Sequence, residues 1–463
     1  MVVDITTLTF QGVNGRDEFQ REKVAEKVIQ LLTSEINLSP MIIDGDWGTG
    51  KTEFCHKLIN KFSTIHSNYR LLYVDAFQAD HADNPLMTIL SAVMTLLPDG
   101  GEKSTLLQKA LPVIRYGLAT TGKAVVSHVL KQNVDDIAEG LEKSLQDAAD
   151  KAIDASVKAL LKDHEKAQAN LKALQKTLEG IAKVSPIVIF IDELDRCRPD
   201  FAVQMLEVIK HTVNVDGLQF VLVTNTQLLQ AAINHRYGHQ VNAQRYLDKF
   251  LKFSFCLPEF LPGRMKRGDD FVLAATEHFS NLIKQSATLR DTALSKINEG
   301  VFTFTEELIR LNRVSLREVE TFTRHLEIYQ RLSQGLKPTT IFGYQLLRIF
   351  GVFTFCFASD IADSIQRNKT DANKVAELLG LSRLPDHKSN NYRASHVAMV
   401  AVILAEASAV NNANYLTTEP EAKKYWSAHK SHYFSGGFGF GSVPDNIFTP
   451  IKEAIVCLRL GSA

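Results

Sequence analysis

The chain has 463 residues, of which 45% are hydrophobic and 22% charged, as in an ordinary globular protein with room for two or three domains. The chain has 52 Lys and Arg residues and 52 Asp and Glu residues, so its formal net charge is zero. The overall charge therefore gives no reason to expect a nucleic-acid partner, and a local basic groove is the alternative that it does not exclude. Five scattered cysteines and an N-terminus without a basic start and apolar core indicate a reduced, cytoplasmic protein.

The first predicted element is a helix that opens at residues 14–20. Its apolar side chains, among them Phe19, Val28 and Ile29, fall mostly along one face. Such a helix either packs only on its own domain or covers the base of a nucleotide bound by the loop that follows.

That loop begins after Met41-Ile42-Ile43, which predicts a short buried strand, and a helix is predicted to leave it. Its glycines, followed by Lys51 and Thr52, fit the phosphate-loop pattern. Glycines let backbone N–H groups surround phosphate oxygens, and the helix N-terminus adds the positive end of its dipole. The alternative is a Gly-rich turn before a basic helix.

Each residue type in the loop has an expected task. Lys51 is expected to reach the β- and γ-phosphates, and the Thr52 hydroxyl to ligate Mg²⁺. The predicted cofactors are therefore ATP and Mg²⁺. The predicted nucleotide-binding residues are Gly45, Asp46, Trp47, Gly48, Thr49, Gly50, Lys51, Thr52 and Glu53.

A second strand is predicted at Tyr69–Asp75, and Asn84-Pro85 predicts a helix start. Residues 101–183 then read as a helical insertion. Its first part, Leu111–Leu130, is moderately apolar, but it carries Arg115, Lys123 and His128, which disfavour a membrane span.

The second part of the insertion, from Val134 to Lys183, is rich in Ala, Leu and charged residues, with Leu171, Leu174 and Leu178 at near-heptad spacing. Long helices or a helical hairpin follow. The segment is either an arm for association or a solvated insertion on its own domain. We expect that a short linker can replace about 45 of its residues without unfolding the ATP-binding core, because surface insertions cost little closure entropy.

The second nucleotide motif follows the insertion. Ile187–Ile191 is an apolar run typical of a central parallel strand, and it ends in Asp192 and Glu193. Asp192 is expected to hold Mg²⁺, usually through water, and Glu193 to polarise the attacking water. Two carboxylates directly after a buried strand lower the stability of the fold unless a cation lies near them.

Gln219–Thr224 predicts another buried strand, which ends at Asn225. Asn225 either senses the γ-phosphate or positions the water, or it only caps the strand. Leu251–Leu257 is the candidate last strand. This order predicts an open α/β fold, the parallel sheet of a P-loop NTPase flanked by helices, with the ligand at the carboxyl ends of the strands. Glu193 beside the metal carboxylate favours hydrolysis over phosphoryl transfer.

Three motifs together resemble the KAP family of P-loop NTPases: Asp44–Thr52, with Trp47 inside the loop, Asp192–Cys197, and Tyr246–Phe250. The resemblance covers roughly residues 14–335. It implies a nucleotide-hydrolysing switch of the additional-strand class with an insertion between the two motifs. Many members carry membrane-spanning helices there, which charged helices replace in this chain, so no membrane partner is expected. Prokaryotic members are frequently associated with defence against phages and plasmids.

Residues 262–335 predict a helical lid. Asn312–Val319 resembles the family's helical motif that carries an arginine toward the nucleotide, with Arg317 as first candidate and Arg313 as second. Arg196 is a possible charge stabiliser beside the carboxylates, and the alternative for each arginine is a surface ion pair. The predicted catalytic residues are Glu193, Lys51, Arg317, Arg196 and Asn225, and the predicted metal ligands are Thr52 and Asp192.

Residues 336–463 predict a C-terminal helical domain, with a buried helix at Ile341–Phe357 and a core helix at His396–Leu404. Ser435–Gly441 puts two aromatic residues in a Gly-rich loop. The loop either stacks on bases or docks a partner, or it folds over its own core.

The sequence thus predicts an NTPase core built from two segments, 1–100 and 184–261. Three further segments are predicted: an insertion at 101–183, a lid at 262–335 and a helical domain at 336–463. We expect an ATP-hydrolysing switch whose nucleotide state controls assembly of a homo-oligomer or a protein effector encoded nearby. Two other interpretations are a nucleic-acid-stimulated motor and a scaffold that binds nucleotide without turnover.

Overall fold

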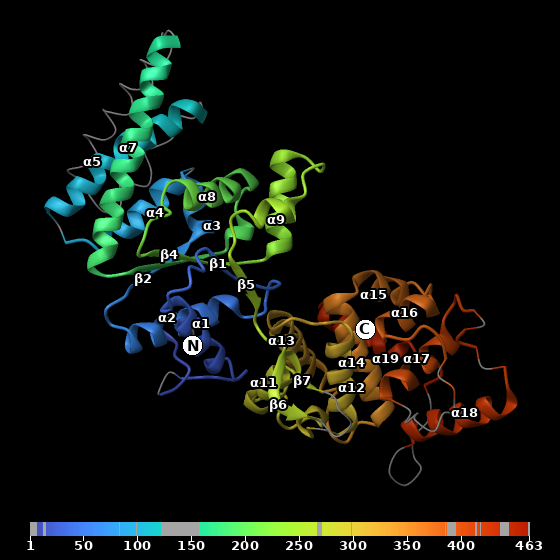
Figure 1. Cartoon of the computed structure of the whole chain (residues 1–463). Coiled ribbons are helices and arrows are strands. Elements are labelled where there is room, and N and C mark those ends of the chain that lie inside the picture. The colour runs from blue at the N-terminus through green and yellow to red at the C-terminus, as the bar shows by residue number, and fades with distance from the viewer. Residues whose placement is uncertain are drawn as a thin grey trace. The chain divides into compact units, whose positions relative to one another are not determined.

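The computed structural model describes residues 7–12, 15–82, 84–98, 100–121, 157–265, 271–297, 299–384, 386, 395–412, 414–416, 418–435 and 444–461. It divides into two compact units, Met1–Pro258 (unit 1) and Glu259–Ala463 (unit 2), whose elements are drawn in Figure 1. No helix in the described ranges is both long and apolar enough to cross a bilayer.

A five-stranded parallel sheet forms the centre of unit 1, in the order β2-β3-β4-β1-β5. Its strands are β1 (Met41–Asp44), β2 (Arg70–Asp75), β3 (Ile187–Asp192), β4 (Leu218–Thr224) and β5 (Phe253–Cys256). All five predicted strands are therefore confirmed. Because β4 lies between β1 and β3, the strand that ends in Asp192 is separated from the phosphate-loop strand by one additional strand.

Helices cover both faces of this sheet (Figure 1). They are α1 (Glu22–Leu32), α2 (Lys51–Ile65), α3 (Ala76–Ala79), α4 (Pro85–Met94), α5 (Gly101–Thr121), α7 (Val157–Val184), α8 (Pro199–His211), α9 (Thr226–Tyr237) and α10 (Ala243–Leu247), with 3-10 turns at Asp80–Ala82 and Leu194–Arg196. Val188 and Phe190 of β3 pack with α1 and α2, whereas Ile189 and Ile191 pack with the helices of the other face. The strand is apolar throughout because its side chains alternate between two buried faces.

The opening helix begins later than the sequence predicted. The Asp17 carboxylate accepts the backbone N–H groups of Arg21 (2.7 Å) and Glu22 (3.1 Å), and Gln20 has a left-handed φ of 53°. Residues 15–20 are therefore not helical, and α1 starts at Glu22. Asn14 lies outside the described residues.

The C-terminal half of α7 belongs to the core of unit 1. Leu174, Leu178 and Ala182 are at most 1% exposed and share a cluster with Leu106 and Ala110 of α5. The expectation that about 45 residues of 134–183 are dispensable is therefore wrong, because α5 and the sheet layer cover the apolar stripe of this half. The part of the insertion at 122–156 lies outside the described residues.

In its described residues unit 2 is mainly helical and contains one two-stranded antiparallel sheet, which the sequence analysis missed. Its elements are β6 (Phe260–Met265), β7 (Phe271–Leu273), α11 (Ala274–Gln285), α12 (Gly300–Leu311), α13 (Leu316–Ser333), α14 (Phe342–Phe357), α15 (Ser359–Gln366), α16 (Ala372–Leu378), α17 (His396–Ala407), α18 (Pro420–Phe434) and α19 (Thr449–Leu458), with a 3-10 turn at Ala293–Ser295. The predicted buried helices at 341–357 and 396–404 are confirmed as α14 and α17.

One hydrophobic cluster joins the regions predicted as lid and C-terminal domain. It contains Phe322 of α13, Phe353 of α14 and Ile455 of α19. Trp426 and Tyr433 of α18 are also buried in it, at 1% and 6% exposure, so these two aromatic side chains serve the core. The Gly-rich loop after Ser435 lies outside the described residues.

Candidate active site

A tight loop joins β1 to α2 at the carboxyl edge of the sheet. Gly50 has a left-handed backbone (φ 81°, ψ 28°) as the N-cap of α2. A Cβ atom on Gly45 would lie 3.2 Å from Thr49 Oγ1 and 3.7 Å from Lys51 Cδ. Thr49 Oγ1 in turn donates to the Asp46 carbonyl at 2.8 Å and closes the loop. The observed geometry therefore requires glycine at both pattern positions.

Lys51 is buried against this loop, with 9% exposure. Its Nζ donates to the carbonyl oxygens of Gly45 (2.6 Å) and Asp46 (3.0 Å). Burial lowers the pKa of Lys51, and the carboxylates of Asp195 and Asp192 oppose that shift. An ammonium group at this place can exchange loop carbonyls for phosphate oxygens, which form stronger, charge-assisted hydrogen bonds with it.

Asp192 ends β3 and is only 2% exposed. Burial raises its pKa, and a hydrogen bond with the Thr52 side chain opposes that shift. Its Oδ1 also accepts the Glu193 N–H at 2.7 Å, and its Oδ2 accepts the Tyr73 hydroxyl at 3.1 Å. The two predicted metal ligands are thus near enough for the Thr52 side chain to oppose the rise in the pKa of Asp192.

Oxygen donors of this kind fit a magnesium ion. Mg²⁺ is usually bound by one or two protein oxygens, substrate phosphates and water. Within the described ranges, no group of three or more His, Cys, Asp or Glu side chains is placed to hold a metal. Thr52 and Asp192 are the residues that would hold Mg²⁺ together with the phosphates of a nucleotide, because both offer oxygen donors.

Glu193 occupies a strained position directly after β3. Its φ of 60° and ψ of 25° are left-handed, which costs free energy for a residue other than glycine and is frequent at functional sites. Its Oε1 lies 2.8 Å from Nη1 of Arg196, and its side chain is 18% exposed. Burial raises the pKa of Glu193, and the Arg196 guanidinium opposes that rise. The predicted base and the predicted charge stabiliser are therefore an ion pair.

Two side chains connect the loop to the ends of neighbouring strands. Trp47 Nε1 donates to Asp195 Oδ2 at 2.6 Å. Asn225 Nδ2 donates to Asp46 Oδ1 at 2.9 Å, while its Oδ1 accepts two backbone N–H groups in the first turn of α9. Asn225 thus caps a helix and holds the loop, and its role toward the γ-phosphate stays a prediction.

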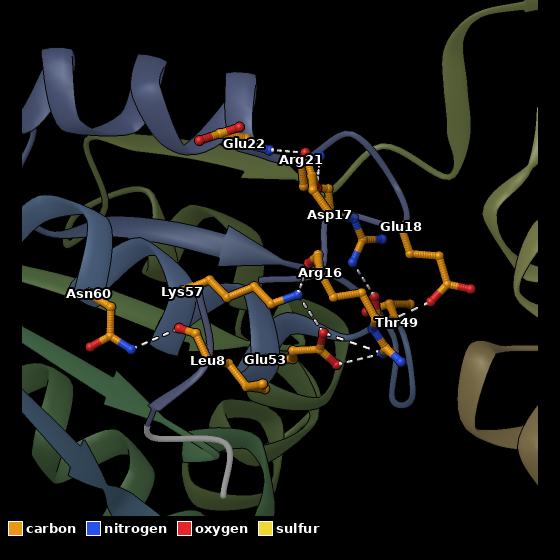
Figure 2. A network of polar contacts seen from close by, with 10 residues as sticks. All are labelled: Leu8, Arg16, Asp17, Glu18, Arg21, Glu22, Thr49, Glu53, Lys57 and Asn60. Atoms are coloured by element: carbon orange, nitrogen blue, oxygen red, sulfur yellow. Dashed lines mark hydrogen bonds and ion pairs between the residues drawn. The ribbon is translucent and has the colours of Figure 1, made fainter. Parts of the chain in front are cut away.

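The segment before α1 is bound to the loop and to α2 (Figure 2). Glu53 forms ion pairs with Lys57 (2.7 Å) and Arg16 (3.4 Å). Nη1 of Arg21 donates to the Thr49 carbonyl at 2.9 Å. The predicted loop residue Glu53 therefore faces this segment. Sequence reasoning missed both arginines, because a charged run such as 16–23 does not show which distant groups it meets.

Two further side chains at the site were also missed. Asp44 accepts the N–H groups of Gly45 (2.8 Å) and Thr226 (2.9 Å) and the Thr226 hydroxyl (2.6 Å). Tyr73 donates to Asp192 from the adjacent strand. Their position at or near the carboxyl end of a parallel strand is the signal that could have found them.

Arg317 and Arg313 belong to unit 2, whereas the other predicted site residues belong to unit 1. Arg317 is exposed in the first turn of α13, which begins with a capping box between Ser315 and Glu318. Arg313 precedes that helix with a φ of 48°. Neither arginine forms an ion pair with another described residue. Their place at the nucleotide stays a prediction.

The strand order, the loop and the carboxylate pair define a P-loop NTPase with an additional strand between its two nucleotide motifs. The model of the KAP family P-loop domain matches residues 21–333, and the chain belongs to this family. No curated protein matches the chain. A solved structure to which it is similar is "Structure of the Aeropyrum Pernix ORC2 protein (ADPNP-ADP complexes)", at 12% identity over 95% of this chain and 93% of that chain, with a TM-score of 0.33.

Proposed function

We propose that this protein binds ATP with Mg²⁺ and hydrolyses it, and that its nucleotide state controls an assembly or a protein effector. The observation that carries the proposal is the place of Asp192 at the end of β3, where burial raises its pKa and both the Thr52 side chain and the Lys51 ammonium oppose that rise, with Glu193 directly after Asp192 in the chain. A hydroxyl and two carboxylates therefore lie at one edge of the sheet near Lys51, and we assign the metal to Thr52 and Asp192.

The charges of the site favour a metal-bound nucleotide over a free one. Among the described residues two cations are bonded to loop carbonyls, Lys51 to those of Gly45 and Asp46 and Arg21 to that of Thr49. The carboxylates that act on Lys51 outnumber them and are those of Asp195, Asp192, Asp44 and Asp46. A bare nucleotide polyanion would be repelled here, whereas bound Mg²⁺ neutralises charge on both the phosphate oxygens and Asp192.

Hydrolysis would use Glu193 as the general base. Released from Arg196, its carboxylate accepts a proton from the attacking water while the water oxygen bonds to the γ-phosphorus and the β–γ bridge bond breaks. Arg196 is then free to stabilise negative charge. Lys51 would bind the β- and γ-phosphates throughout.

The switch would depend on unit 2. An arginine such as Arg317 pairs bidentately with phosphate oxygens, so its arrival would favour one arrangement of the units with ATP and another after hydrolysis. Two states of this kind can control a homo-oligomer or an effector encoded nearby. The family resemblance suggests prokaryotic defence as the context.

Steady-state phosphate release tests this function. The wild-type protein should release phosphate from Mg·ATP, and Glu193→Gln should be slower by at least about a hundredfold, because an amide cannot take the proton. Glu26→Gln is the matched control, because the one ion pair of this carboxylate within the described residues is with Lys61 at 2.9 Å, and wild-type turnover is expected. Turnover that appears only with DNA or RNA would favour a motor, and binding without turnover would favour a scaffold.

A further inference from the structure

Arg21 holds two parts of unit 1 with one side chain. Asp17 fixes its backbone at the start of α1, as described above. The residue is 6% exposed, and Figure 2 shows its guanidinium directed at the phosphate loop. Nη1 donates to the Thr49 carbonyl at 2.9 Å, and Nη2 to the Pro258 carbonyl at 3.4 Å. The loop and the last residue of unit 1 therefore share one guanidinium.

Arg21 forms no ion pair with another described residue, although the carboxylates of Glu53, Asp17 and Glu18 lie near enough to raise its pKa against the effect of burial. Its Nε is buried too and has no hydrogen-bond partner there. Burial lowers the pKa of Arg21 to about 10, so the group is still charged at neutral pH. A buried charge that forms no ion pair is costly. Phosphates bound by the loop would add negative charge to that of these carboxylates, so Arg21 and the nucleotide would stabilise each other.

The contact with Thr49 also fixes the orientation of the next N–H group. In a planar trans peptide the C=O and the following N–H point in opposite directions. With its oxygen held by Arg21, Thr49 presents the Gly50 N–H on the side away from the guanidinium. Gly50 is the N-cap of α2, where backbone N–H groups bind phosphate. Arg21 thus pre-orders a donor of the loop.

The contact with Pro258 lies where the chain leaves unit 1. Leu257 is 5% exposed in the core beside β1, and the Glu259 carbonyl accepts the Ala274 N–H of unit 2 at 2.7 Å. The Pro258–Glu259 peptide therefore joins a residue fixed in one unit to a residue fixed in the other. A displacement of the Pro258 carbonyl would move the first residue of unit 2.

We propose that Arg21 is a positioning residue that couples the phosphate loop to the joint at Pro258. Nucleotide binding shifts the Thr49 carbonyl, and the shared guanidinium passes the shift to the start of unit 2. This inference rests on the proposed nucleotide binding and concerns how occupancy of that same site reaches the second unit.

Amide hydrogen exchange of the whole chain, with and without a non-hydrolysable ATP analogue and Mg²⁺, tests the coupling. In the wild type, both the loop peptide (residues 45–54) and the joint peptide (residues 257–265) should exchange more slowly with the analogue. In Arg21→Met the affinity should fall about tenfold. At saturation the loop should still be protected, and the joint should not respond.

Two more variants sharpen the result. Arg21→Lys keeps the charge but lacks the planar fork that reaches two carbonyls, so it should keep near-wild-type affinity and lose the joint response. This variant decides the matter if Arg21→Met does not fold. Arg245→Met, which removes an exposed arginine of α10, should behave as wild type.

A joint response that persists in both Arg21 variants would overturn the proposal. So would an equal loss of loop and joint protection with a lower melting temperature, which indicates a purely structural role. A wild-type loop that the analogue does not protect would instead contradict the proposed nucleotide binding.

Discussion

Trp47 Nε1 donates a hydrogen bond of 2.6 Å to Asp195 Oδ2, and Asp195 Oδ1 accepts the Thr224 hydroxyl at 3.1 Å. The tip of the phosphate loop is thereby tied to the turn after β3 and to the end of β4. The Trp47 side chain is otherwise half exposed, at 53%. Any movement of the loop against the turn after β3 must change the surroundings of this indole.

Trp47 should therefore report nucleotide binding by its fluorescence. The chain has 2 tryptophans, and the other, Trp426, is 1% exposed in the core of unit 2. Addition of Mg·ATP should change the emission of the wild type and of Trp426→Phe, but not of Trp47→Phe. A full response in Trp47→Phe would show that Trp426, and not Trp47, reports nucleotide binding.

Arg196 should set the pH dependence of turnover. Glu193 must be ionised to act as a base, burial raises its pKa, and Arg196 holds it down. Without Arg196 the pKa rises further, so the acid limb of the kcat–pH profile should move to higher pH in Arg196→Ala. Arg198→Ala, which removes an arginine paired with Asp80 at 3.0 Å, should leave that limb in place. An unmoved limb in Arg196→Ala would mean that Glu193 is not the titrating base.

The substitution Asp192→Asn should impair function but raise the stability of the nucleotide-free protein. Burial raises the pKa of Asp192 in the folded protein, so the native state binds more protons than the unfolded state and loses stability as pH rises through that pKa. An amide lacks this penalty. The melting temperature of nucleotide-free Asp192→Asn should therefore exceed that of the wild type by a margin that grows with pH, while Mg·ATP should no longer raise it. A margin that shrinks as pH rises would contradict the assignment.

Much of the nucleotide site was readable in the sequence because its signals are local. The loop glycines, Lys51 and Thr52 are adjacent in the chain, and Asp192 follows a run of five apolar residues, so each prediction needed only neighbours. Arg21, in contrast, meets Thr49 and Pro258, which are 28 and 237 positions away. No periodicity encodes such a pairing. Only the folded chain reveals it.

The fold shows the same division between local and distant signals. Apolar runs located the strands, whereas the start of α1 depends on the Asp17 carboxylate and not on the apolar face of the helix. The leucines of α7 recur at near-heptad spacing, which predicted an apolar stripe along the helix but not what covers it. Leu174 and Leu178 are covered by α5 and the sheet layer, and the sequence of α7 alone contains no mark of that cover.

The insertion should therefore tolerate only a shorter deletion. Replacement of residues 122–163 by a Gly-Ser linker keeps Leu174 and Leu178 and should leave a folded protein that binds ATP. Leu178→Ala in the full chain should instead cost about 2–5 kcal/mol, since this side chain is 1% exposed. Thermal unfolding and nucleotide titration of both proteins provide the comparison. A deletion protein that fails to fold, or an unaffected Leu178→Ala, would contradict this boundary.

Native mass of the same deletion protein, with and without nucleotide, tests the proposed assembly role of the insertion. Nucleotide-dependent assembly in the wild type that is lost in the deletion would identify an association arm. Unchanged assembly would show that the removed residues are not needed for it.

The most direct test of the central claim is a single-turnover measurement with excess protein and radiolabelled ATP. The wild type should bind ATP and convert it to ADP and phosphate, Glu193→Gln should retain bound, unhydrolysed ATP, and Lys51→Ala should bind none. This pattern separates phosphate binding from water activation at the two motifs. Conversion by Glu193→Gln at the wild-type rate, or wild-type binding by Lys51→Ala, would contradict the account.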